Sequence, residues 1–211
     1  LVCRVSVADG VAGQKGAQIH PADGNRVEAL GPLRLLGMDV VAATTDPARL
    51  VVGVAAAAVR TDDKLIVACA TADASGNPTL ALDRAGKQIW KTTIGATTIQ
   101  GKHRKASGSN PSPVTDGKYL FVYFKTGDLA CLTLTGKLVW QTNLQKAWGK
   151  DTLWWDLGTS PVLSKDKVLV AVMQTGGSYV AAFEKKDGDV AWKHNRNLEA
   201  PLEAAQSYTT P

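Results

Sequence analysis

The sequence contains little cysteine, and its cysteines do not mark a site. There are three, Cys3, Cys69 and Cys131, and none lies in a Cys-x-x-Cys metal or redox spacing. The odd number argues against a disulfide framework. Cys69 and Cys131 lie in short apolar runs typical of strands, where a buried and unreactive thiol is the expectation.

Long apolar runs and catalytic motifs are also missing. No run reaches the roughly 18 apolar residues of a membrane span, so no transmembrane segment is predicted. The motifs Gly-x-Ser-x-Gly, Gly-x-x-x-x-Gly-Lys-Ser/Thr and His-Glu-x-x-His are absent. The sequence therefore offers no catalytic residue and no metal-ligand set.

Charge of one sign is not concentrated either. The net charge is +5, and the excess is not gathered along one helix face. Nucleic acid is therefore not predicted as a partner. Hydrophobic residues make up 45% and charged residues 20%, which is typical of a globular protein with a core.

Aromatic residues are absent from the first 50 positions, although the chain has six Trp, four Tyr and three Phe. Residues 1–54 are rich in Gly, Ala and Asp and do not match the repeats found later. This N-terminal segment is a degenerate preceding blade, a linker, or sequence from a mis-called start. The residues themselves do not choose among these three.

Residues 112–144 organise the rest of the chain. Their apolar runs are four to eight residues long and rich in aromatic and β-branched residues, which predicts four short strands. Gly127 and Gly136 lie in the turns between them. Glycine supplies the positive φ that tight hairpin turns need.

The same pattern recurs before and after this stretch. Ser160-Pro161-Val162 repeats Ser112-Pro113-Val114 at a distance of 48 residues, and Trp90, Trp140 and Trp192 are 50 and 52 residues apart. A four-strand unit at such a period predicts a β-propeller. We predict an all-β fold of four-stranded antiparallel blades. The predicted units are residues 55–94, 112–144 and 160–196, with a further blade beginning at 207.

The units resemble the PQQ-like repeat of quinoprotein-type β-propellers, which runs roughly Ala-x-Asp-x-x-Thr-Gly-x-x-x-Trp. The resemblance covers about residues 55–211. Within it, about residues 102–211 also resemble the bacterial PQQ-binding-like repeat proteins abundant in planctomycetes. The copies are residues 81–90 with Ala85 at the Thr position, residues 131–140 with Thr133 at the Asp position, and residues 182–192 with Glu184 and Asp187 at the Asp and Thr positions.

The resemblance implies a ring of seven or eight blades, with the first strand of each blade at the central axis. Three blades cannot close a ring, so we expect the chain to be part of a longer propeller. By itself it should expose unpaired edges and be unstable or aggregate. The resembled topology also implies that links from one blade to the next cross a face of the disc from rim to axis.

Two of these links hold the candidate binding residues. Residues 148–158 contain three tryptophans, and Trp154, Trp155 and Asp156 combine aromatic faces with a carboxylate. Such a group stacks a planar ligand, grips a sugar or docks a protein, or alternatively packs between blades. His103 and Arg104 belong to a basic run that either binds an anion or is a solvated loop.

Trp90, Trp140 and Trp192 are predicted to be structural, because they recur at one position of the outer strand. For function, the preferred hypothesis is a non-enzymatic binding or scaffolding propeller, similar to outer-membrane assembly propellers, with a protein or glycan partner. The alternative is a quinoprotein oxidoreductase that uses PQQ and Ca²⁺ to oxidise an alcohol or sugar. Fold alone does not decide between them. By resemblance, the protein is periplasmic or at the cell surface.

Overall fold

A computed structural model of the chain describes residues 76–83, 87–95, 108–202 and 204–210, together with four short strands nearer the N-terminus. Two of these, β1 (Leu33–Leu35) and β2 (Met38–Val40), pair as an antiparallel two-stranded sheet. They lie within the N-terminal segment whose role the sequence leaves open.

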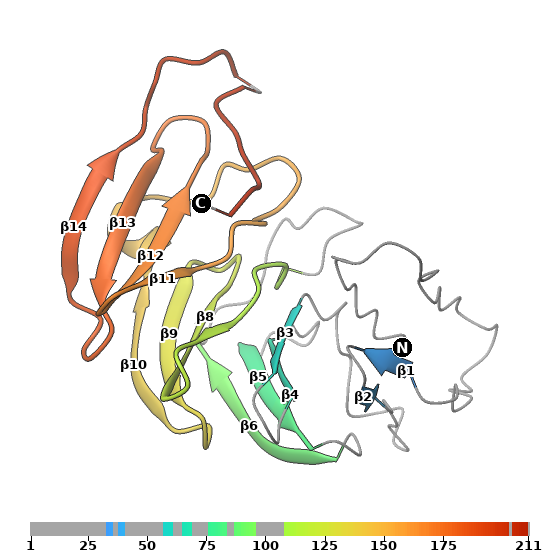
Figure 1. The fold of residues 1–211 in the computed structure, drawn as a ribbon. Helices are drawn as coiled ribbons and strands as arrows, with labels where there is room; N and C mark the ends of the chain where they lie inside the picture. The colour runs from blue at the N-terminus through green and yellow to red at the C-terminus, as the bar shows by residue number, and fades with distance from the viewer. Residues whose placement is uncertain are drawn as a thin grey trace.

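Three four-stranded antiparallel sheets follow along the chain and confirm the predicted all-β propeller blades (Figure 1). In each sheet, strands adjacent in sequence are adjacent in space. The predicted division at residue 55 and a further blade from 207 stay predictions. The first blade contains β3 (Ala57–Arg60), β4 (Leu65–Ala68), β5 (Asn77–Leu82) and β6 (Gln88–Ile94); the second contains β7 (Val114–Thr115), β8 (Tyr119–Tyr123), β9 (Asp128–Thr133) and β10 (Leu138–Asn143); the third contains β11 (Val162–Ser164), β12 (Lys167–Val172), β13 (Tyr179–Glu184) and β14 (Val190–Asn195).

Two boundaries differ from the sequence pattern. β7 and β11 begin directly after Pro113 and Pro161, because proline has no N–H to donate to a strand ladder.

The link after β10 begins with a helix that the sequence did not predict, α1 (Leu144–Trp148). Asn143 caps it by accepting a hydrogen bond from the Lys146 N–H at 2.9 Å.

The second blade is buried on both faces. Side chains alternate along its inner strands, so Phe121 and Cys131 pack toward the third blade, while Leu120 and Leu132 pack toward the first. All four side chains have no exposed surface. A strand buried on both sides has no polar face, and this explains why its sequence is a continuous apolar run.

Two tryptophans join neighbouring blades. The ring of Trp90 in the first blade lies on Gly136 in the second, and that of Trp140 lies on Gly188 in the third. A Cβ added at Gly136 would lie 2.5 Å from the Trp90 ring, and one added at Gly188 would lie 2.6 Å from the Trp140 ring. The Trp140 indole N–H donates to the Lys185 carbonyl at 2.8 Å, and Trp90 makes the same kind of bond at 3.1 Å. The glycine of the repeat thus provides both the turn and the space for the preceding blade's ring.

A β-bulge precedes this tryptophan in each blade. In the second blade Trp140 pairs with Cys131 and Leu138 pairs with Leu132, which leaves Val139 as the extra residue. The other two blades shift register at the same point. A bulge turns the following side chain, so Trp140 faces the next blade while Leu138 and Val139 remain partly exposed.

Cys131 is a free thiol with no exposed surface, as the sequence predicts. Burial, with a smaller contribution from the Asp116 charge, raises the pKa of the thiol to about 12. The thiol is therefore protonated at neutral pH and is a packing group of the core. Cys3 and Cys69 lie outside the described residues.

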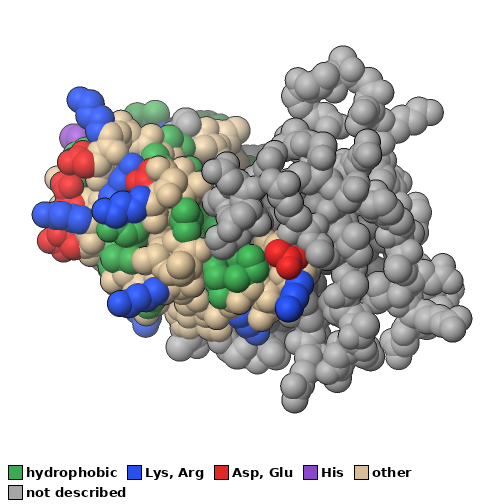
Figure 2. Space-filling view, turned by 60° about the horizontal axis from the view of Figure 1, so that its bottom comes forward, with side chains coloured by type: hydrophobic (Ala, Val, Ile, Leu, Met, Phe, Trp, Pro, Cys, Tyr) green, Lys and Arg blue, Asp and Glu red, His purple; other side chains and the backbone are tan. Residues whose placement is uncertain are grey.

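The side of the blades that carries the turns between third and fourth strands has a mixed surface. We call it the turn side, and Figure 2 brings it toward the viewer. Acidic and basic side chains lie side by side there, with hydrophobic patches between them. Ion pairs join Lys185 to Asp116 at 3.2 Å and Lys167 to Glu184 at 3.0 Å.

Candidate docking site

The opposite side, which we call the link side, carries the connections between blades. Strands of a meander alternate in direction, so the turn between the second and third strands emerges on the same side as the link that leaves the fourth. The link that joins β10 to β11 therefore passes over the turn that joins β8 to β9. The described residues of the link side are 108–111, 124–127, 144–161, 173–178, 196–202 and 204–208.

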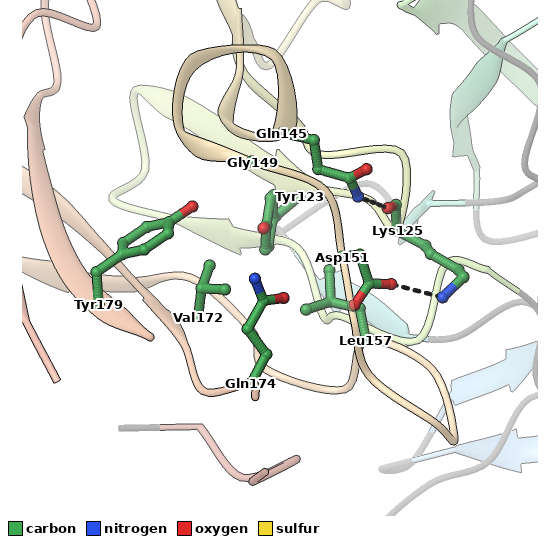
Figure 3. Close-up of a pocket in the computed structure, with 9 residues that line it drawn as sticks. All are labelled: Tyr123, Lys125, Gln145, Gly149, Asp151, Leu157, Val172, Gln174 and Tyr179. Carbon is green, nitrogen blue, oxygen red and sulfur yellow. Dashed lines mark hydrogen bonds and ion pairs between the residues drawn. The ribbon is translucent and has the colours of Figure 1, made fainter. Parts of the chain in front are cut away.

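A small pocket lies on the link side between the second and third blades (Figure 3). Its volume is about 10 Å³, close to the space that one water molecule needs. Burial raises the pKa of both Tyr123 and Tyr179, so their hydroxyls are protonated at neutral pH. The lining residues are Tyr123, Lys125, Gln145, Gly149, Asp151, Leu157, Val172, Gln174 and Tyr179.

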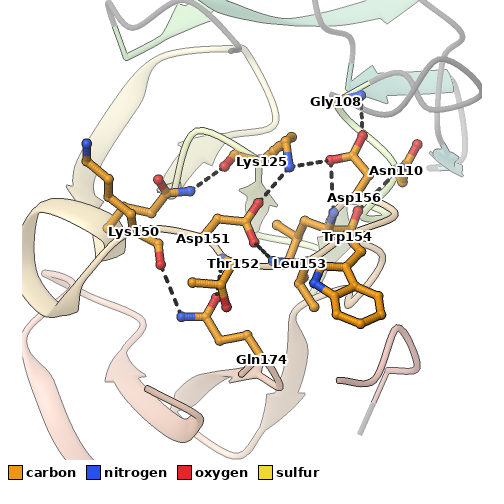
Figure 4. Close-up of polar contacts among 12 residues, drawn as sticks. Gly108, Asn110, Lys125, Lys150, Asp151, Thr152, Leu153, Trp154, Asp156 and Gln174 are labelled. Carbon is orange, nitrogen blue, oxygen red and sulfur yellow. Dashed lines mark hydrogen bonds and ion pairs between the residues drawn. The ribbon is translucent and has the colours of Figure 1, made fainter. Parts of the chain in front are cut away.

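Lys125 ties the link to the second blade through its contacts with Asp151 and Asp156 (Figure 4). It lies in the turn between β8 and β9, is 8% exposed, and pairs with Asp151 at 2.6 Å and Asp156 at 3.1 Å. The Asp156 carboxylate also accepts hydrogen bonds from the backbone N–H groups of Gly108 at 3.2 Å and Leu157 at 2.9 Å. One buried cluster therefore connects two successive links and one turn.

The charged state of Lys125 is stabilised by this cluster. Burial by itself lowers the pKa of the ammonium group. The hydrogen bond and charge of Asp151, together with the charge of Asp156, outweigh that effect and leave the pKa above its ordinary value. Lys125 is therefore a permanent cation beneath the link at any physiological pH.

Two glutamine side chains hold the middle of the link. Gln174 accepts a hydrogen bond from the Thr152 N–H and donates to the Lys150 carbonyl, both at 3.2 Å. Gln206, from the link after the third blade, accepts from the Trp154 N–H at 3.2 Å and donates to the Thr152 carbonyl at 3.4 Å. The backbone on both sides of Leu153 is thus fixed by groups outside the link.

Asp156 has an unusual backbone conformation. Its φ is +120°, a region that residues with a Cβ rarely adopt. Such strain costs on the order of 1–3 kcal/mol and persists only where surrounding contacts enforce it. The contacts of Asp156 with Lys125 and Gly108 supply that enforcement, and the bend directly follows Trp155.

The three tryptophans of the link have different environments. Trp148 packs edge-on against Tyr179, with ring centroids 5.0 Å apart, and is partly buried against the core between the second and third blades. Trp154 and Trp155 are each 53% exposed. The sequence could not distinguish packing from presentation at a surface, and the structure assigns packing to Trp148 and exposure to the other two.

The predicted site residues are therefore only partly brought together. Asp156 lies next to Trp155 in the chain, but its side chain is buried and turned toward Lys125. His103 and Arg104 lie outside the described residues. Lys125, Gln174 and Gln206 hold the link but were missed by sequence reasoning. The sequence held one clue to Lys125, because a charged residue directly follows the apolar run of β8.

The described residues contain no group of three or more His, Cys, Asp or Glu side chains that could hold a metal ion. No helix in the described part of the chain has the length and hydrophobicity that crossing a membrane requires. The link side presents two half-exposed tryptophans on a backbone held by side-chain hydrogen bonds.

Comparison with known families gives a match over most of the described residues. The family model described as outer membrane protein assembly factor BamB matches residues 76–210, which is more than half of the chain and includes the whole link side described above. No curated protein matches the chain.

Two solved structures illustrate the range of similar proteins. The chain is 21% identical to the quinohemoprotein alcohol dehydrogenase from Comamonas testosteroni, with a TM-score of 0.49, over 72% of this chain and 23% of that one. It is 16% identical to BamB from Moraxella catarrhalis, with a TM-score of 0.37, over 66% of this chain and 51% of that one. The chain thus spans about a quarter of the dehydrogenase and half of the assembly factor. Similarities at these TM-scores carry no argument about function.

Proposed function

The chain belongs to the family of the outer membrane protein assembly factor BamB, and we propose that it is a non-enzymatic binding propeller that docks a protein partner on its link side. Trp154 and Trp155 are the anchors of this docking surface. Asp156 and Lys125 lie beneath the anchors and hold the link in place. One observation carries the proposal. Two half-exposed tryptophans lie on a stretch of backbone that is hydrogen-bonded to Gln174 and Gln206.

The physical argument is that exposed aromatic anchors on a preorganised loop bind with little loss of conformational entropy. Tryptophan is enriched among the residues that dominate binding energy at protein interfaces. The ion pairs of Lys125 and the amide contacts of Gln174 and Gln206 order the link before any partner arrives. Two large, half-exposed apolar side chains at adjacent positions of such a link favour a function in binding.

The pocket and the carboxylates described above offer no site for PQQ and calcium. The pocket between the second and third blades has room for about one water molecule, which is far smaller than a tricyclic quinone. The described residues hold no cluster of carboxylates that would bind Ca²⁺. The quinoprotein alternative therefore gains no support from the described part of the chain.

The proposal includes the cellular location. A family whose name refers to outer membrane protein assembly favours the periplasm or the cell surface. We also keep His103 and Arg104 within the proposal, on the sequence alone, as a basic segment that precedes Gly108 in the chain.

Photo-crosslinking tests the docking surface in cells that produce the protein. Benzoylphenylalanine at position 155 should give light-dependent protein adducts, whereas the same residue at position 139 should not. Val139 is a matched control, because it is 39% exposed on the outer strand β10 and away from the link side. Absence of adducts at position 155, or equal adducts at both positions, would contradict the proposal.

Alanine replacement of both tryptophans is expected to weaken binding of the crosslinked partner at least tenfold. Truncating an anchor residue at an interface typically costs about 2 kcal/mol or more. Urea denaturation of the variant shows whether the loss of binding is separate from a loss of stability, because half of each side chain is buried in the unbound protein. Saturable quenching of tryptophan fluorescence by PQQ with Ca²⁺, together with dye-linked alcohol oxidation, would instead establish the oxidoreductase.

A further inference from the structure

We propose that the link side selects an extended segment of a partner protein in which acidic residues precede or follow apolar ones. This inference rests on the proposed docking function and adds the chemistry of the partner. Its basis is the distribution of charge along the link from α1 to β11. The docking function would not by itself require that distribution.

The exposed charges of this link are all positive. Lys146 and Lys150 are exposed. A third exposed lysine, Lys193 on β14, approaches the outer end of the link, where its ammonium group lies 5.2 Å from the centre of the Trp148 ring. We call Lys146, Lys150 and Lys193 the lysine rim.

The carboxylates of the same link are turned inward. Asp156 is 3% exposed, and the side chain of Asp151 is 13% exposed. Both bind Lys125 beneath the link, and Asp151 also accepts a hydrogen bond from the Leu153 N–H at 2.8 Å. Lys125 therefore does more than hold the link in one conformation. It withdraws the acidic groups of the link from the surface and leaves the lysines there.

The lysines and the tryptophans occupy successive parts of one path. The link starts at Leu144, directly after the outer strand β10, and ends at Val162, where the inner strand β11 begins. The lysine rim lies near the outer start of this path, and Trp154 and Trp155 lie further along it toward the inner strand. A partner segment that follows the link would meet positive charge first and aromatic surface second.

The turn side lacks this arrangement. Acidic and basic side chains alternate there (Figure 2), and Lys185 and Lys167 are neutralised by ion pairs with Asp116 and Glu184. A segment with one sign of charge would meet carboxylates as well as lysines on the described part of that side. The turn side therefore supplies an internal control for any charge effect.

Selection from a random 12-residue peptide library displayed on phage tests the inference with the complete protein as bait. We expect enrichment of peptides in which Asp or Glu stands within a few positions of Trp, Phe or Leu. The best synthetic peptide should bind a Lys146→Glu, Lys150→Glu, Lys193→Glu variant at least tenfold more weakly. It should bind a Lys118→Glu, Lys137→Glu, Lys186→Glu variant, with the same change of net charge on the turn side, as tightly as the parent.

The outcomes separate this inference from the docking function. Enriched peptides without acidic residues, no enriched peptide, or equal weakening by both triple variants would overturn the acidic preference. Adducts at position 155 would then leave the docking function standing. Binding of a glycan on an array, lost with Trp154→Ala and Trp155→Ala but unchanged by the lysine variants, would replace the protein partner with a sugar.

Discussion

Replacement of Lys125 by methionine is expected to lower the free energy of unfolding by about 3 kcal/mol. Methionine has nearly the same length, so the change removes the charge and keeps most of the packing. It leaves the buried Asp156 and the largely buried Asp151 without their cation. Breaking a buried ion pair from one side typically costs about 3–5 kcal/mol, and the partial exposure of Asp151 places the effect near the lower end.

Urea denaturation measures this effect as a lower midpoint at an unchanged slope. Lys118→Met is the control, because Lys118 is exposed on the turn side and should shift the stability by no more than about 0.5 kcal/mol. Equal stability of Lys125→Met and the parent would show that the cluster does not hold the link.

The pH dependence of the same pair of proteins gives an independent readout. The pKa of Lys125 is raised in the folded protein above its ordinary value near 10.5. A lysine with a raised folded pKa contributes stability that is complete below its unfolded pKa and is lost as the pH rises through the folded pKa. Between neutral pH and about pH 10 the difference in stability between parent and Lys125→Met should therefore be constant, and it should shrink above that.

Replacement of Trp140 by alanine should destabilise the chain by about 3–5 kcal/mol, the usual cost of removing a buried tryptophan. Its ring is 9% exposed, lies on Gly188 and has a centroid 6.1 Å from that of Phe121. The change also leaves the Lys185 carbonyl without its 2.8 Å hydrogen bond. Loss of this residue uncouples the second blade from the third.

Trp192→Ala is the matched control, because it removes the same residue from the same position of the repeat. Trp192 is 36% exposed, and its ring centroid lies 5.2 Å from that of His194. Its loss should therefore lower the free energy of unfolding of this chain by roughly 1 kcal/mol. The two variants are compared by urea denaturation. Equal losses at both positions would mean that the tryptophan acts within its own blade and not between blades.

Much of the fold could be predicted because the repeat states its local requirements in more than one blade. The turn glycines, the Ser-Pro beginnings and the spaced tryptophans are local patterns, and each agrees with the strand ladders. The helix α1 was missed because its signal is a single cap at Asn143, within a segment that otherwise matches no repeat.

The site was only partly predictable, because its geometry depends on residues far apart in sequence. The link's unusual tryptophan content drew attention to Trp154 and Trp155, but composition could not tell an exposed ring from a packed one. Lys125 is 26 residues from Asp151, and Gln206 is 52 residues from Trp154. No local pattern records such contacts.

The sequence by itself determined the four-stranded blade and the place of glycine and tryptophan within it, because backbone propensity and alternation act over a few residues. Only the tertiary structure decided which tryptophans are buried and where the charges of the link point. Those outcomes depend on the next blade. A tryptophan is buried when a neighbouring glycine leaves room for its ring, and a carboxylate turns inward when a buried lysine from another turn is there to pair with it.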